Sequence, residues 1–217
     1  HEEKNLLSTI RKGQYEGLKA RLTGGETPHN EHTRLPDFGS KQWGEEAEKT
    51  GAITIGARGI LVAYNVNINE PDANVAKKIG SLVRSTGRLV KREDGRRMRV
   101  PGMLPMVQGM GVTLEAHGLS QVSMNLRDVT KCPMHVAFEA CKSIASDHDT
   151  STPGSELVGL VPLEAMLESG RWYADQDVND ERELVGAAIE GLGLDSLGSF
   201  DPDERIIEWA LLKAVNQ

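Results

Sequence analysis

The chain has 217 residues, of which 38% are hydrophobic, 26% charged and 4% aromatic, the composition of an ordinary soluble globular protein. Its apolar runs fall short of the ~20 residues of a membrane span, and it carries no signal-peptide pattern, so we expect no membrane partner. A formal net charge of −7 disfavours a general nucleic-acid binder.

The first 50 residues predict one helix followed by a long loop. Apolar side chains recur at helical spacing over residues 3–22, whereas residues 26–50 are polar and rich in turn formers. A loop of that length is usually functional or mobile. Within it, Trp43 is either a hydrophobic anchor or a platform for a flat ligand. His29 and His32 have no carboxylate or Cys partners that would complete a metal site, so we expect no metal.

A small-residue run then leads into a strand. Residues 60–68 are β-branched and apolar without Gly or Pro, which predicts a buried strand. The small residues Gly51, Ala52, Gly56, Ala57 and Gly59 would let a ligand approach the backbone, and Arg58 offers a bidentate guanidinium for a carboxylate. The alternative is a glycine-rich turn with a solvated Arg58. Asn65 and Asn67 within the strand need partners if they are buried, either a ligand or a neighbouring backbone.

The remaining elements predict an α+β fold. After the first strand we expect a helix at 71–86, strands at 106–114 and 119–128, a helix at 133–144 and a strand at 156–162. This βαββαβ order over about 60–162 is that of a ferredoxin-like domain, an antiparallel four-stranded sheet with two helices on one face. Helices at 163–172, 181–192 and 203–213 would form a C-terminal helical appendix.

Two further features leave alternatives open. Residues 88–99 hold six basic and two acidic side chains, and we interpret them as a linker that is either merely solvated or a positive patch for an anionic tail. The two cysteines, Cys132 and Cys141, fit no zinc or redox spacing, which favours reduced thiols in a cytosolic protein.

Nine segments of the chain resemble, in the same order, the formiminotransferase family. They are residues 10–18 (IRKGQYEGL), 36–39 (PDFG), 51–52 (GA), 56–58 (GAR), 61–67 (LVAYNVN), 121–126 (QVSMNL), 157–163 (LVGLVPL), 193–197 (GLDSL) and 204–208 (ERIIE). No single segment is specific, but together they cover nearly the whole chain.

The resemblance implies a cytoplasmic transferase. The family moves the formimino group of N-formimidoyl-L-glutamate to N5 of tetrahydrofolate, a step of histidine catabolism, without a metal. Its fold is two α/β subdomains with a ligand tunnel between them. By this resemblance, residues 1–58 (helix and folate loop) end the first subdomain and residues 59–217 are the second. The catalytic histidine then lies upstream of His1, so this chain holds no catalytic residue and is inactive alone. We further expect a homodimer.

The resemblance also assigns a folate-binding loop after the PDFG segment. The residues expected to bind the folate are Gly39, Ser40, Lys41, Gln42, Trp43, Gly51, Ala52, Thr54, Gly56 and Arg58. The insert between Gly39 and Gly51 is longer than the family pattern, which leaves open which loop residue touches the pterin. The alternative functions are a non-catalytic ferredoxin-like folate-binding module and a purely structural fragment.

Overall fold

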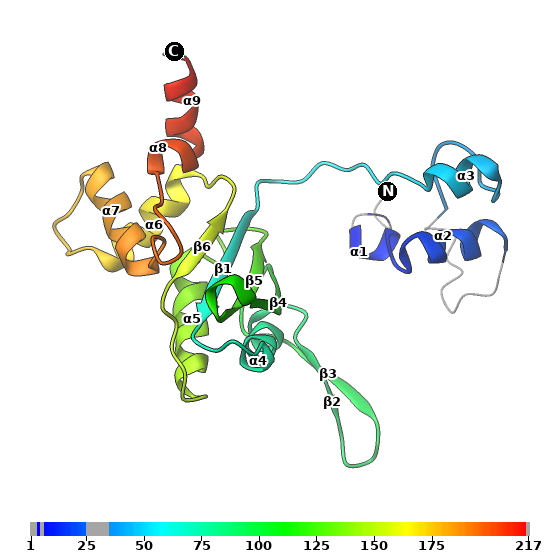
Figure 1. The fold of residues 1–217 in the computed structure, drawn as a ribbon, viewed down its shortest axis with the longest axis horizontal. Helices are drawn as coiled ribbons and strands as arrows, with labels where there is room; N and C mark the ends of the chain where they lie inside the picture. Colours follow the sequence, from blue (N-terminus) through cyan, green and yellow to red (C-terminus); the bar gives the residue numbers. More distant parts are fainter. Residues whose placement is uncertain (1–3, 5–6, 25–34, 216–217) are drawn as a thin grey trace. The chain divides into compact units, whose positions relative to one another are not determined.

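The computed structural model describes residues 4, 7–24 and 35–215, and it divides the chain into two compact units, His1–Arg58 and Gly59–Gln217 (Figure 1). None of the helices in these described ranges is long and apolar enough to cross a membrane.

Three short α-helices lie in the described part of the N-terminal unit. They are α1 (Leu7–Ile10), α2 (Gln14–Leu22) and α3 (Glu45–Thr50). The prediction of one continuous helix over 3–22 was wrong, because the chain turns at Gly13, whose φ of 82° is left-handed and therefore favours glycine. The part of the expected loop that is described, residues 35–50, contains α3, and residues 26–34 lie outside the described residues. All side chains of α3 are exposed or half-exposed, so it has no apolar period that the sequence could reveal.

The second unit is built on a four-stranded antiparallel sheet. Its strands are β1 (Val62–Ile68), β4 (Val107–Leu114), β5 (Leu119–Leu126) and β6 (Ser155–Val158), in the order β4-β5-β1-β6. Helix α4 (Asn74–Val83) connects β1 to β4, and α5 (Met134–Ser146) connects β5 to β6. A 3₁₀ turn, η3 (Glu115–His117), joins β4 to β5. The α+β prediction is confirmed, and the ferredoxin-like pattern holds approximately.

A second, two-stranded sheet interrupts that pattern between α4 and β4. The residues expected to form a linker at 88–99 instead form a hairpin of β2 (Arg88–Lys91) and β3 (Arg97–Val100). The turn between the strands uses Gly95 at φ 81°. Apolar residues alternate with the basic ones in β3 (RMRV) but not in β2 (RLVK), so the segment as a whole shows no clear two-residue period.

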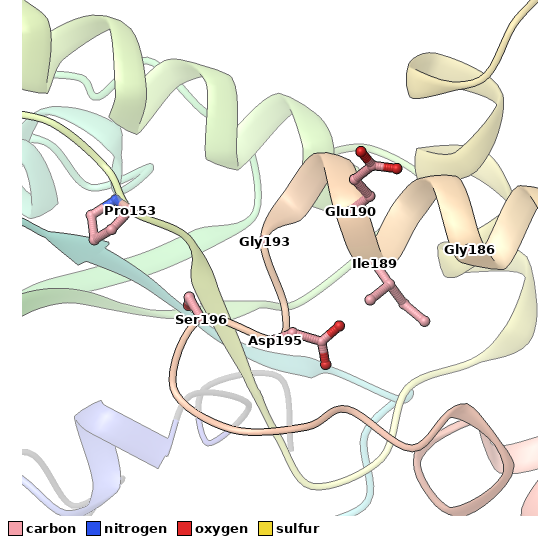
Figure 2. A pocket seen from close by; sticks show the side chains of 7 residues that line it. All are labelled: Pro153, Gly186, Ile189, Glu190, Gly193, Asp195 and Ser196. Atoms are coloured by element: carbon pink, nitrogen blue, oxygen red, sulfur yellow. The ribbon is translucent and has the colours of Figure 1, made fainter.

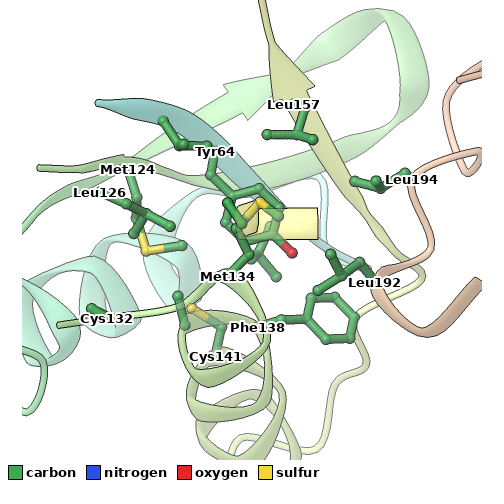
Figure 3. Close-up of a cluster of buried hydrophobic side chains, with 14 of the residues drawn as sticks. Tyr64, Met124, Leu126, Cys132, Met134, Phe138, Cys141, Leu157, Leu192 and Leu194 are labelled. Carbon is green, nitrogen blue, oxygen red and sulfur yellow. The ribbon is translucent and has the colours of Figure 1, made fainter. Parts of the chain in front are cut away.

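The core lies between the sheet and the helices α4 and α5 (Figure 3). On β1 the alternate residues Val62, Tyr64 and Val66 are fully buried on this side. The Tyr64 hydroxyl donates to Ser155 Oγ at 2.9 Å, and Ser155 Oγ donates to the Leu192 carbonyl at 2.7 Å, so the buried hydroxyls have partners.

Four helices follow the sheet: α6 (Leu163–Tyr173), α7 (Glu181–Leu192), α8 (Pro202–Arg205) and α9 (Ile207–Val215). The helix expected at 203–213 divides at Ile206, which is fully buried and forms a parallel bridge with Val161. The strand expected at 156–162 correspondingly ends at Val158, and only Val161 resumes extended pairing. Asp180 caps α7 by accepting from the amides of Arg182 and Glu183.

Candidate functional site

The face of the four-stranded sheet opposite α4 and α5 is lined by polar side chains. Because side chains alternate along a strand, the residues between the core positions of each strand point to this second face. We call it the polar face, and it comprises Asn65 and Asn67 of β1, Gln121, Ser123 and Asn125 of β5, and Glu156 of β6. Five of these six residues carry an amide or a carboxylate.

The register of the strands places these groups opposite one another. Asn65 pairs with Ser123 on one side and with Glu156 on the other, while Asn67 pairs with Gln121. The strands β5, β1 and β6 therefore lie next to one another although they are remote in sequence, with β1 between the other two.

The amides form a continuous hydrogen-bonded network. Gln121 Nε2 donates to Asn67 Oδ1 at 2.8 Å and to Glu156 Oε2 at 3.1 Å. Asn65 Nδ2 donates to the same Glu156 oxygen at 3.2 Å and to Gln121 Oε1 at 3.4 Å. Asn67 is fully buried and Gln121 is 3% exposed, so the bond between them is shielded from water, whereas the bonds of Asn65 and Glu156 are partly buried.

The network continues into the loop after α7. Asn67 Nδ2 donates to Ser196 Oγ at 3.0 Å. This loop is pressed against the start of β6, because a Cβ added at Gly154 would lie 2.4 Å from the Gly193 carbonyl oxygen. Glycine at position 154 therefore permits the close approach that brings Ser196 to Asn67.

A cavity of about 500 Å³ opens beside this loop (Figure 2). It is lined by Pro153, Gly186, Ile189, Glu190, Gly193, Asp195 and Ser196. The Asp195 carboxylate accepts a hydrogen bond from the Phe200 amide at 2.6 Å, which fixes the loop. Ser196 thus belongs both to the cavity wall and to the hydrogen-bonded network of the polar face.

The residues predicted from the sequence lie in the N-terminal unit. A cavity of about 1370 Å³ in that unit is lined by seven of them, namely Gly39, Ser40, Gln42, Gly51, Ala52, Thr54 and Gly56. Lys41, Trp43 and Arg58 do not line it. The structure therefore brings together most of the predicted loop, although their contact with folate stays a prediction.

Two of the three remaining residues have clear surroundings. The Trp43 ring packs edge-on against Tyr15 with centroids 5.6 Å apart, and Lys19 Nζ lies 5.4 Å from its centre. These contacts favour the anchor alternative for its ring. Arg58 is exposed in an extended segment and makes no hydrogen bond or ion pair with any described residue.

Burial explains the shifted pKa values of three side chains outside the polar face, Cys132, Cys141 and His135. Burial raises the pKa of Cys132 to about 11 and the pKa of Cys141 further still. Burial lowers the pKa of His135, whose ring stacks on Trp172 with centroids 5.1 Å apart. Across the described ranges, no group of three or more His, Cys, Asp or Glu side chains is placed to hold a metal ion. His29 and His32 lie outside the described residues.

Sequence reasoning missed Gln121 and Glu156 as candidates, although it noted that Asn65 and Asn67 need partners. The available signal was the two-residue period of polar groups at 121, 123 and 125, which matches that of the two asparagines. Glu156 gave no such signal, because only the pairing of β6 with β1 brings it to the network.

Comparison with known proteins places these observations in a family. Residues 63–212 match the formiminotransferase domain. The chain is 36% identical over 209 residues to the formimidoyltransferase-cyclodeaminase of Mus musculus, a match that covers 95% of this chain and 35% of that protein. The Dictyostelium discoideum protein of the same name is 37% identical over 209 residues, covering 94% of this chain and 35% of that protein. The glutamate formimidoyltransferase of Streptococcus pyogenes serotype M1 is 31% identical over 183 residues, covering 84% of this chain and 53% of that protein.

The chain thus spans about a third of the length of the first two relatives and about half of the third. The matched residues include β1 from Ala63 onward, β5, β6 and the loop that carries Ser196, and so contain the whole polar face. These matches confirm the resemblance noted in the sequence, and the chain belongs to the formiminotransferase domain family.

Proposed function

We propose that this chain is part of a glutamate formimidoyltransferase, which moves the formimino group of N-formimidoyl-L-glutamate to N5 of tetrahydrofolate in cytoplasmic histidine catabolism. The observation that carries the proposal is the polar face within a matched formiminotransferase domain. Its fixed amides and carboxylate have the hydrogen-bonding chemistry that amidine and pterin groups require. The relatives, a formimidoyltransferase-cyclodeaminase and a glutamate formimidoyltransferase, support formimino transfer by their names.

The two units of this chain are assigned to the two subdomains of the formiminotransferase family. We propose that residues 1–58 are the end of the first formiminotransferase subdomain and residues 59–217 the second, with the rest of the first subdomain preceding this chain. The matches cover 35% and 53% of two of these relatives, which leaves room for a further subdomain outside this chain. That half supplies the catalytic histidine, and the complete enzyme is a homodimer.

The reaction needs a base, a stabilised tetrahedral centre and firm positioning of two anionic substrates. The folate amine attacks the formimidoyl carbon and gives up its proton, while the bond to the glutamate nitrogen breaks and that nitrogen gains a proton. Positioning of reacting groups contributes on the order of 7–11 kcal/mol in favourable systems. In this chain the small residues Gly51, Ala52 and Gly56 give a substrate access to backbone amides. Arg58 supplies a guanidinium for a carboxylate, and the polar face supplies fixed hydrogen bonds.

Two alternatives remain distinguishable by experiment. A non-catalytic folate-binding module would bind reduced folate without turnover, and a structural fragment would do neither. The experiment purifies the natural gene product that contains this chain and measures formimino transfer from N-formimidoyl-L-glutamate to tetrahydrofolate. In parallel, calorimetry measures binding of folinic acid to the same protein. Turnover supports the proposal, and its absence with folate binding intact selects the module.

A further inference from the structure

Glu156 is a half-buried carboxylate that the polar face holds without a cation. Its Oε2 accepts from Asn65 Nδ2 at 3.2 Å and from Gln121 Nε2 at 3.1 Å. Among the described residues, no group donates to its Oε1, and no Lys, Arg or His side chain forms an ion pair with it. A carboxylate whose partners are all neutral can still accept a charge-assisted hydrogen bond, which leaves the site suited to a positively charged or N–H-donating group.

The orientation of the two amides is dictated by the carboxylate. An ionised carboxylate only accepts hydrogen bonds, so Asn65 and Gln121 must both turn their NH₂ groups toward Glu156. The second N–H of Gln121 Nε2 donates to Asn67 Oδ1 at 2.8 Å. The second N–H of Asn65 Nδ2 donates to Gln121 Oε1 at 3.4 Å. The donors of both amides are therefore occupied.

The oxygen atoms of Asn65 and Glu156 that have no hydrogen-bond partner among the described residues are acceptors. Asn65 Oδ1 receives no hydrogen bond from a described residue, and neither does Glu156 Oε1. These two oxygens belong to side chains that form a direct hydrogen bond with each other. A ligand that satisfies both must offer two N–H donors, and it gains most if it also carries positive charge.

We propose that Glu156 and Asn65 together recognise a planar N–C–N group that donates two N–H bonds. This inference rests on the proposed function, whose two substrates both contain such a group. In N-formimidoyl-L-glutamate the group is the amidine that is transferred, and in tetrahydrofolate it is the 2-amino-4-oxopyrimidine ring. Gln121, Asn67 and Ser196 act as positioning residues, because they fix the amides that hold the carboxylate.

The test uses the whole chain and two probes that separate the sources. Formamidinium chloride represents the amidine, and pterin represents the folate ring. Lumazine, in which an oxo group replaces the 2-amino group of pterin, is the matched ligand control. Binding is followed by NMR through the side-chain amide signals of Asn65 and Gln121, which report on the site at any affinity.

The variant Glu156→Gln keeps the shape of the side chain and removes its charge. We expect the dissociation constant of the recognised probe to rise about tenfold, the effect of losing a charge-assisted hydrogen bond. Glu115→Gln, which removes an exposed carboxylate from η3, is the matched control and should leave binding unchanged. Glu156→Asp retains the charge but shortens the side chain, and should also weaken binding if Glu156→Gln fails to fold.

The outcomes are separable. Loss of only the formamidinium response assigns the amidine, and loss of only the pterin response, with lumazine inactive throughout, assigns the folate ring. Equal binding by wild type and both Glu156 variants overturns the inference. If the gene product transfers formimino groups and Glu156→Gln leaves both KM values unchanged, the proposed function stands and the inference falls. If a probe binds through Glu156 but the gene product transfers no formimino group, the inference stands and the proposed function falls.

Discussion

Replacing Asn67 with Leu tests whether the polar face is held rigidly by its hydrogen bonds. Leucine has nearly the shape of asparagine, so the change opens no cavity, but it removes the bonds to Gln121 at 2.8 Å and to Ser196 at 3.0 Å. An orphaned N–H of buried Gln121 costs about 2 kcal/mol, and the lost bond to Ser196 about 1 kcal/mol. Burying a leucine returns about 1.5 kcal/mol. We therefore expect Asn67→Leu to lower the free energy of unfolding by about 1.5 kcal/mol.

The measurement is urea unfolding followed by circular dichroism. With a slope of about 2 kcal/mol per molar urea, the midpoint should fall by about 0.7 M. Asn125→Leu is the matched control, because Asn125 lies half-buried on the same face and its side chain forms no hydrogen bond with a described residue. That control should stay within about 0.5 kcal/mol of wild type. If the two variants unfold at the same urea concentration, the network does not stabilise the sheet, and the argument for a fixed carboxylate at Glu156 fails.

Three further predictions follow from single side chains. Arg58→Ala in the gene product should weaken folinic acid binding about tenfold, or about 1.4 kcal/mol by calorimetry, whereas an unchanged constant would mean a solvated arginine. Cys132 and Cys141, whose pKa values burial raises, should resist Ellman's reagent at pH 8 until urea is added, and rapid labelling of the native protein would contradict their burial. Burial lowers the pKa of His135, so the unfolded state binds more protons and stability should fall as pH drops below about 6.5. His135→Phe should reduce that dependence in urea titrations at pH 5 and 7.5, and an identical dependence would count against it.

The long elements of the second unit could be predicted because one face of each is buried. The helix expected at 181–192 is α7 with the same bounds, and the helix expected at 163–172 is α6 to within one residue. On β1 the buried side chains of Val62, Tyr64 and Val66 alternate with polar or small ones. Where one face of an element is buried, apolar residues recur in the sequence at the spacing of that helix or strand, and the element can be predicted.

The elements that could not be predicted lack that period or depend on distant contacts. Helix α3 is exposed or half-exposed throughout, and the β2–β3 hairpin carries mostly charged side chains. The break at Ile206 depends on its bridge to Val161, 45 residues earlier in the chain. The same reason hid the site: Asn65 and Glu156 are 91 residues apart in sequence, and only the strand order makes them neighbours.

The two candidate regions differ in rigidity, and this difference assigns them different roles. The predicted folate residues lie on exposed loop and extended backbone, whereas the polar face is carried by three paired strands whose side chains bond to one another. Sites on strands hold groups more precisely than sites on loops, and a transfer between two substrates depends on orientation to a fraction of an ångström. We therefore expect the orientation-sensitive contact to involve Glu156 and Asn65, and the loop to contribute affinity and access. It follows that loss of the Glu156 charge should lower kcat as well as binding, whereas changes in the loop should act mainly on KM.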